Sequence, residues 1–181
     1  MDGMIKLVIL DVDGVLTDGT KQYSEDGKVQ SKRYCDKDWT AIKRFKALGI
    51  PVICITGDPY NVLILKNRNL PVIVSRGKGF HADKVQYLSE ACRNHGCDPK
   101  DVVFVGDDLF DSGIMKAVGH PFCVADSPRS VRQIASPLPV SGGENVVMHL
   151  FEYLEEGGLI ERVAMETVMT RIYELDVLET F

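Results

Sequence analysis

Short runs of apolar, often β-branched residues alternate along the chain with longer amphipathic segments. This alternation is typical of successive β-α-β units that wind around a parallel sheet. We expect strands at residues 5–10, 51–55, 71–74, 102–105, 121–124 and 138–140. We expect helices from residue 36 or 38 to Gly49, and at residues 59–68, 81–95, 109–118, 127–135, 144–155 and 159–175. The predicted fold class is α/β, with a Rossmann-like parallel sheet that carries helices on both faces.

One segment departs from this alternation directly after the first strand. Residues 19–34 read "GTKQYSEDGKVQSKRY", in which Asp26-Gly27 separates two polar, β-prone arms. This pattern predicts a β-hairpin that forms a short flap. The flap is interpreted either as a plain surface excursion or as a lid or subunit contact, since long excursions beside a crevice are often functional. We expect a single domain over residues 1–181, with a helical extension at about 157–181.

Composition and charge narrow the class of protein. The 181 residues are 45% hydrophobic and 26% charged, and the net charge of -5 argues against a nucleic-acid partner, which would favour a basic face. No apolar run approaches the ~20 residues that span a bilayer, so we expect a cytoplasmic protein without a membrane partner. The five cysteines suit reduced core thiols. A zinc site at Cys92, His95 and Cys97 is an alternative, although the usual paired ligand spacing is missing.

Acidic residues follow two of the predicted strands. Asp11 and Asp13 follow the first strand, and Asp107 follows the strand at 102–105. The carboxyl ends of parallel strands meet at one edge of a sheet, where ligands bind. Alternate residues of an extended chain share a face, and close carboxylates repel one another unless a cation lies between them. Oxygen ligands suit Mg²⁺, so these three residues form a predicted magnesium site. Capping of a turn or helix is the structural alternative for Asp11 and Asp13.

A phosphate site is predicted beside these carboxylates. Thr56 offers a hydroxyl at the end of the strand at 51–55, and the amide of Gly57 can approach an anion closely. Lys84 can reach a phosphate and offset the negative charge, and Lys78 is its rival. The alternatives are a plain turn after the strand for Thr56 and a solvated helix face for Lys84.

Two further acids, Asp108 and Asp111, fall on the first turn of the next predicted helix. Acidic residues favour this position through the helix dipole, whatever their chemistry. We expect Asp108 to support the ligands and to contribute to substrate binding, whereas Asp111 is equally consistent with a site role and a capping role.

These motifs resemble the haloacid dehalogenase superfamily. The resemblance rests on "LDVDGVLTDG" (10–19), "ITGD" (55–58), "ADK" (82–84) and "VGDDLFD" (105–111). The "VLTDG" extension, the short flap in place of a large cap and "SGGENVV" (141–147) are similar to the branch that includes 3-deoxy-D-manno-octulosonate 8-phosphate phosphatases and phosphatases of nine-carbon sialic-type acids.

The resemblance implies a role for each matching residue. Asp11 is expected to be the nucleophile that forms an aspartyl-phosphate, and Asp13 the acid that protonates the leaving group and then activates water. The carboxylates of Asp11 and Asp107, with the backbone carbonyl of Asp13, would hold Mg²⁺. Thr56 and Lys84 would bind the phosphoryl oxygens. Covalent catalysis of this kind divides one hard hydrolysis into two easier steps.

Two positions depart from the pattern of the branch. Asp58 stands where an arginine is usual, and Trp39 stands where a glycine is usual. An aspartate facing the pocket would repel an anionic substrate, and an indole would reshape the crevice or stack on a substrate. These departures favour a substrate other than the eight-carbon acid itself. Trp39 is equally consistent with a place on the core stripe beside Ile42 and Phe45.

The leading hypothesis is a Mg²⁺-dependent phosphatase that acts on a phosphorylated small sugar or sugar acid of the 3-deoxy-octulosonate or nonulosonate 8/9-phosphate type. A nucleotidase or phosphotransferase of the same superfamily is the first alternative, and a non-catalytic oligomerisation or sensing module is the second. Relatives in the branch form tetramers whose hairpins pack together, which implies a homotetramer here as well.

Overall fold

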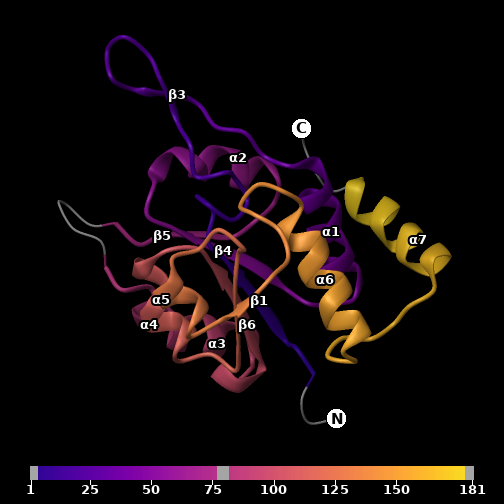
Figure 1. Ribbon diagram of the computed structural model, residues 1–181. Helices are drawn as coiled ribbons and strands as arrows, with labels where there is room; N and C mark the ends of the chain where they lie inside the picture. Colours follow the sequence, from indigo (N-terminus) through magenta and orange to yellow (C-terminus); the bar gives the residue numbers. More distant parts are fainter. Residues whose placement is uncertain (1–3, 77–81, 178–181) are drawn as a thin grey trace.

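The computed structural model describes residues 4–76 and 82–177, and its centre is a six-stranded parallel sheet (Figure 1). The strand order is β5-β4-β1-β6-β7-β8. Their bounds are β1 Leu7–Leu10, β4 Val52–Thr56, β5 Val72–Val74, β6 Val102–Gly106, β7 His120–Cys123 and β8 Ser136–Pro137. The predicted α/β fold with a parallel sheet is therefore confirmed.

The three central strands are buried along their whole length. β1 lies between β4 and β6, with Leu10 opposite Cys54 on one side and Val105 on the other. Continuous apolar runs are typical of strands that are covered on both faces, which is why these segments could be recognised in the sequence. The strands β4 and β5 lie on one side of β1, and the later strands β6, β7 and β8 lie on the other, so the strand order reverses beside β1. The carboxyl ends of β1, β4 and β6 therefore border one crevice.

Helices cover both faces of this sheet (Figure 1). One hydrophobic core joins alternate strand residues to α1 and α6, and another joins the remaining strand residues to α3 and α4. The first core includes Phe45 and Phe151, whose rings meet edge to face. The helix bounds are α1 Asp36–Ala47, α2 Val62–Asn67, α3 Leu88–His95, α4 Ser112–Met115, α5 Arg129–Arg132, α6 Val146–Glu156 and α7 Met165–Asp176.

Several predicted helices are shorter than expected because single 3-10 turns precede them. Such turns span Pro59–Asn61 before α2, Lys84–Tyr87 before α3 and Leu109–Asp111 before α4. A further turn spans Pro99–Asp101, directly before β6. The expected helices at 109–118 and 127–135 are reduced to α4 and α5, each four residues long. Apolar spacing shows which residues are buried, but it does not separate one regular helix from a series of short turns.

The last predicted strand is displaced in the structure. β8 spans Ser136–Pro137, not residues 138–140. Leu138 and Val140 still lie beside β7, since the Leu138 amide donates to the Cys123 carbonyl and the Ala125 amide donates to the Val140 carbonyl. Leu138 is buried in the core, so its apolar side chain signalled burial and not strand geometry.

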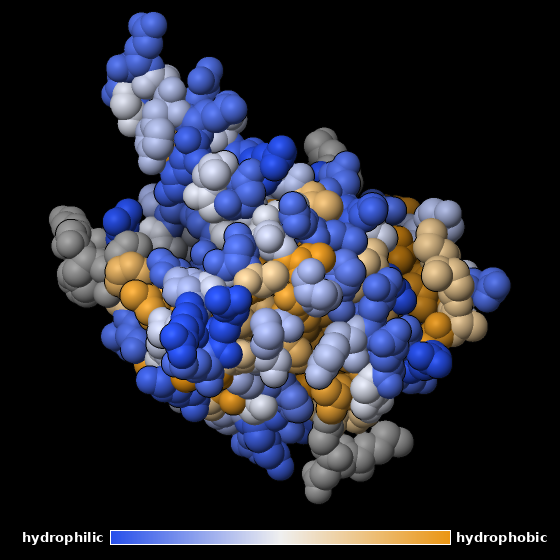
Figure 2. Space-filling view, viewed as in Figure 1, coloured by the Kyte–Doolittle hydropathy of each residue, from blue (hydrophilic) through white to orange (hydrophobic). Residues whose placement is uncertain are grey.

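The predicted hairpin is present and projects from the sheet (Figure 1). Its arms are β2 Gln22–Tyr23 and β3 Val29–Ser31, which pair antiparallel. We call residues 19–34 the flap. Figure 2 shows that the outer part of the flap is covered by hydrophilic residues.

The expected helix at 159–175 begins later, at Met165, and forms α7. α7 packs on α1 through Ala47, Val168 and Ile172. Arg171 adds a hydrogen bond of 3.0 Å to the carbonyl oxygen of Ala47. No helix within residues 4–76 and 82–177 is long and apolar enough to cross a membrane.

Candidate active site

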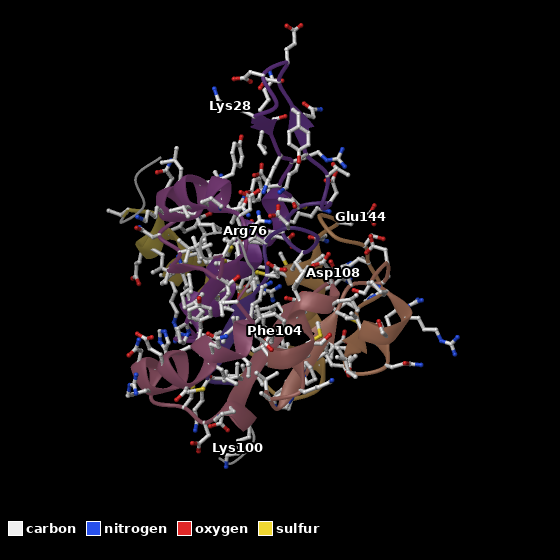
Figure 3. The ribbon with its side chains drawn as sticks, turned by 90° about the vertical axis from the view of Figure 1, so that its left-hand side faces the viewer. Lys28, Arg76, Lys100, Phe104, Asp108 and Glu144 are labelled. Atoms are coloured by element: carbon white, nitrogen blue, oxygen red, sulfur yellow. The ribbon has the colours of Figure 1, made fainter. Side chains whose placement is uncertain are left out.

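A cavity of about 330 Å³ opens where the carboxyl ends of β1, β4 and β6 meet the base of the flap. Figure 3 shows Arg76 and Asp108 between the flap, which carries Lys28, and the sheet at Phe104, while Lys100 lies at the opposite end. The cavity is lined by Asp11, Asp13, Gly19, Lys21, Gly57, Asp58, Arg76, Lys84, Asp107, Asp108, Phe110 and Asp111. Most of the predicted site residues are therefore neighbours in space.

Lys84 forms the centre of the acidic cluster. Its Nζ lies 2.6 Å from Oδ2 of Asp11 and 2.6 Å from Oδ1 of Asp111. All three residues are buried. The other oxygen of Asp111 accepts hydrogen bonds from the backbone amides of Asp107 and Asp108. Asp111, which was consistent with either role at the sequence level, therefore fixes both the lysine and the loop after β6.

The carboxylates of Asp11, Asp107 and Asp111 form the one potential metal cluster among the described residues. One oxygen from each lies within 4.8 Å of the others. This all-oxygen set fits a hard divalent cation such as Mg²⁺. The predicted set of ligands included Asp13, but its side-chain oxygens accept hydrogen bonds from Lys32 and Asn61. Whether its backbone carbonyl serves as a ligand stays a prediction.

Gly14 makes room for this cluster. Its φ is +81°, and a Cβ at this position would lie 2.0 Å from Oδ2 of Asp107. A side chain there would displace the Asp107 carboxylate, so the glycine after the two aspartates is needed both for its backbone angle and for close approach.

Burial has the largest effect on the pKa values of Asp11 and Asp107. It raises the pKa of Asp11 to about 7, against the opposing effect of Lys84. Burial and the charges of Asp11 and Asp111 raise the pKa of Asp107 to about 8. Burial alone would lower the pKa of Lys84, but its contacts with Asp11 and Asp111 raise it instead. Two carboxyls that hold protons near neutral pH become strong ligands once a cation replaces those protons.

The predicted phosphate-binding residues are divided between the cavity wall and the layer behind it. Gly57 and Asp108 line the cavity. Asp108 also caps the following turn, because its Oδ1 accepts a hydrogen bond from the Leu109 amide. Thr56 is fully buried and does not line the cavity. Its Oγ1 accepts hydrogen bonds from Nδ2 of Asn61 and from the Asp58 amide.

Asp13 is held by residues that the sequence analysis did not identify. Its Oδ1 accepts from Nζ of Lys32 at 2.6 Å, and its Oδ2 accepts from Nδ2 of Asn61 at 3.0 Å. Tyr34 donates its hydroxyl to Oδ1 of Asn61 at 3.0 Å. Lys32 and Tyr34 come from the flap and Asn61 from the turn before α2. A polar residue in a surface hairpin gives no sequence signal of this contact, so only the fold reveals it.

The repulsion expected from Asp58 is offset in the structure. Asp58 does line the cavity, but its Oδ2 lies 2.7 Å from Nζ of Lys21 and 2.8 Å from Nζ of Lys32. Burial alone would raise the pKa of Asp58, but the hydrogen bonds from both lysines hold it well below its usual range. The argument against an anionic substrate therefore loses its electrostatic basis.

Trp39 belongs to the core and does not line the cavity. Its ring stacks on Tyr34, with centroids 5.5 Å apart. Of the two interpretations of this residue, the core stripe is the one that the structure supports. The neighbouring Asp38 is also buried and accepts hydrogen bonds from the first amides of α6, at Val147 and Met148.

Two other sequence-level alternatives concern cysteines and lysines. Cys92, His95 and Cys97 form no metal cluster among the residues that the structure describes. Cys92 and Cys97 are free thiols. Lys78, the rival of Lys84, lies outside the described residues.

Comparison with known proteins finds similarity to hydrolases and phosphatases. The family of haloacid dehalogenase-like hydrolases matches residues 79–151. The 3-deoxy-D-manno-octulosonate 8-phosphate phosphatase of Escherichia coli K12 is 28% identical over 151 residues, which cover 83% of this chain and 79% of that enzyme.

Solved structures agree with this match. The cobalt-bound deoxy-D-mannose-octulosonate 8-phosphate phosphatase of Haemophilus influenzae is 26% identical, with a TM-score of 0.76 and coverage of 84% of this chain and 88% of that one. The 3-deoxy-D-manno-octulosonate 8-phosphate phosphatase of Moraxella catarrhalis, in complex with a magnesium ion, a phosphate ion and a KDO molecule, has a TM-score of 0.74 at 24% identity, over 84% of this chain and 86% of that one. At this identity, the second likeness concerns the fold.

Proposed function

We propose that this chain is a phosphoric monoester hydrolase of the haloacid dehalogenase type, which hydrolyses the phosphate ester of a small sugar or sugar acid through an aspartyl-phosphate. The observation that carries the proposal is the contact of the buried Asp11 with Lys84, inside a cavity whose wall also holds Asp107. This contact supports the proposal, in which a nucleophile, a cation and a metal ligand share one small volume.

We propose that Asp11 and Asp107 hold Mg²⁺ together with the carbonyl of Asp13, with Asp111 nearby. When bound, the ion supplies positive charge against the phosphoryl oxygens. Asp11 and Asp107 fit this role because burial and the repulsion between neighbouring carboxylates raise their pKa values, and a bound cation would stabilise their ionised forms. Lys84 supplies a second positive charge beside Asp11, in contact with the same cavity.

The proposed reaction has two steps. A carboxylate oxygen of Asp11 attacks phosphorus, the bond from phosphorus to the ester oxygen breaks, and Asp13 gives a proton to the departing alkoxide. Asp13 then takes a proton from water, whose oxygen attacks the phosphorus of the aspartyl-phosphate and releases phosphate with Asp11 restored. Such transfer depends mainly on positioning and on neutralised charge.

Lys84, Gly57 and Thr56 are proposed to hold the phosphoryl oxygens. Lys84 and Gly57 reach the cavity directly. Thr56 lies behind the wall, where its hydroxyl orders the Asp58 amide and Asn61, so a direct contact requires its hydroxyl to turn towards the phosphate. Asp108 is proposed to contact the organic part of the substrate from the rim.

The size of the cavity supports a small substrate, since about 330 Å³ accommodates a monosaccharide phosphate. Six aspartates line the cavity against the cationic Lys21, Arg76 and Lys84, so an anionic substrate depends on the cation that the aspartates would hold. A nucleotidase or phosphotransferase of the same superfamily is the second candidate. The match to sugar-acid phosphatases favours the first.

The test is phosphate release by the purified protein with Mg²⁺, from matched panels of sugar, sugar-acid and nucleoside monophosphates. We expect the highest kcat/KM among the sugar-acid phosphates. Asp11→Asn should lower kcat by at least about 1,000-fold, while Asp26→Asn at the exposed flap tip should leave it unchanged. Faster release from nucleotides would favour the second candidate. No release from any ester would favour a non-catalytic module.

We also propose that the protein assembles as a homotetramer through its flaps. The flap projects from the body, and Tyr23 on β2 is 61% exposed (Figure 1). The hydrophilic surface of the flap requires polar contacts in such an assembly (Figure 2). Light scattering after gel filtration should give four times the chain mass of 20.1 kDa, and Tyr23→Ser should shift it towards smaller species. A monomer at micromolar concentration would contradict this assembly.

A further inference from the structure

Lys32 is an unusual residue for a surface hairpin, because its side chain is fully buried. Its ammonium has three donors, and three acceptors surround it: Oδ1 of Asp13 at 2.6 Å, Oδ2 of Asp58 at 2.8 Å and Oδ1 of Asn61 at 2.8 Å. A buried charge is costly unless it is paired and fully hydrogen-bonded. Lys32 meets this condition only when the flap lies against the cavity.

The contacts of Lys32 restrict the carboxylate of Asp13. Lys32 reaches one oxygen of Asp13 and Asn61 reaches the other, so the carboxylate plane is held from two sides. Each oxygen keeps a further lone-pair direction. Asp13 also lines the cavity, so the held carboxylate borders the volume that we propose for the substrate.

Asp58 and Asn61 hold Lys32 in turn. Asp58 also pairs with Lys21 of the flap, and the Tyr34 hydroxyl donates to Asn61. Three flap residues thus contact two residues that lie between β4 and α2. This network explains why an aspartate is suitable at position 58, where the related branch usually has an arginine: it neutralises the two flap lysines that approach it.

We propose that Lys32 is the positioning residue for Asp13, and that the flap thereby orients the proton-transferring group of the reaction. The inference rests on the proposed function, since it concerns Asp13 as the group that exchanges a proton with the leaving oxygen. Lys32 does not line the cavity and acts through its contact with Asp13. Its effect is to keep Asp13 in the geometry in which the proton moves as the bond from phosphorus to the ester oxygen breaks.

The leaving group provides a readout that a purely structural role would not move. A poor leaving group such as phenol depends on protonation, whereas p-nitrophenol leaves with little help. The value of kcat/KM covers only the steps up to aspartyl-phosphate formation, in which the leaving group departs. We therefore compare phenyl phosphate with p-nitrophenyl phosphate, with Mg²⁺ present, in the wild type and in Lys32→Met.

Lys32→Met should lower kcat/KM for phenyl phosphate at least about 10-fold more than for p-nitrophenyl phosphate. Lys28→Met is the matched control, because Lys28 lies on the same flap, is 82% exposed and pairs only with Asp26 in the described structure. Its ratio between the two substrates should equal that of the wild type. Equal losses on both substrates, or no loss, in Lys32→Met would overturn the proposal.

A second variant keeps the proposal testable if Lys32→Met does not fold. Asp58→Asn removes the charge of one of the three acceptors of Lys32 and should shift the substrate ratio in the same direction by a smaller factor. An unchanged ratio in an active, folded Asp58→Asn protein would overturn the proposal. Failure of the wild type to release phosphate from these esters and from the sugar, sugar-acid and nucleoside monophosphates would instead contradict the proposed function, so the two failures are distinct.

Discussion

The pKa values of the acidic cluster predict that Mg²⁺ binding depends steeply on pH. Without metal, burial raises the pKa of Asp11 to about 7 and that of Asp107 to about 8. The two carboxyls interact, so below these pKa values the pair keeps at least one proton in most molecules. Mg²⁺ binds the ionised forms, so its affinity is low below these pKa values and rises as pH passes through them.

The expected change follows from these populations. Affinity should rise by at least about 10-fold between pH 6 and pH 8, because protons leave the pair over this range. Near pH 6.5, each Mg²⁺ bound should release between about one and two protons.

Isothermal titration of Mg²⁺ into the protein, in buffers of different ionisation enthalpy, measures both quantities without substrate. Asp26→Asn serves as a control, because Asp26 lies at the exposed turn of the flap and should leave both quantities unchanged. An affinity that is constant from pH 6 to pH 8, or binding without proton release, would refute the reasoning. Either result would mean that Asp11 and Asp107 are already ionised, and that burial does not dominate the cluster.

Three further predictions concern single residues. Gly14→Ala places a Cβ 2.0 Å from Oδ2 of Asp107, so Mg²⁺ affinity should fall at least about 10-fold by titration calorimetry; unchanged affinity would contradict the close approach. Lys84→Met leaves two buried carboxylates without their cation and should lower the free energy of unfolding in urea by about 3–5 kcal/mol, and a loss below about 1 kcal/mol would argue against a buried ion pair. Burial raises the pKa of Asp38 to about 6, so its contribution to stability is present at low pH and is lost as pH rises through 6. The free energy of unfolding of Asp38→Asn, measured relative to the wild type, should therefore rise by up to about 3 kcal/mol between pH 4 and pH 7. A difference that stays constant over this range would show that Asp38 is ionised throughout.

The sequence alone was sufficient to predict the sheet and the convergence of its acidic strand ends. Strands β1, β4 and β6 are continuous apolar runs, and parallel strands bring their carboxyl ends together by topology. For that reason Asp11 and Asp107 could be predicted to meet. Lys84 does not directly follow a strand, and Lys78 was its rival at the sequence level. The residue roles proposed for them came from the motifs and from the resemblance.

Only the tertiary structure decided which side chains face one another across the flap. Lys32 and Asn61 carry no motif, and their contacts with Asp13 depend on how a hairpin folds back over a strand end. The sequence also did not determine where the side chains of Asp58 and Trp39 point, because periodicity does not say whether a residue faces a cavity, a partner charge or the core.

Local patterns also left the ends of the elements open. Leu138 is buried beside β7 but lies outside β8, and α7 begins at Met165, six residues after the predicted start. Burial depends on apolar side chains, which the sequence displays directly. Hydrogen-bonded geometry and ion pairs depend on neighbours that are distant in the chain, and these are set only when the whole fold has formed.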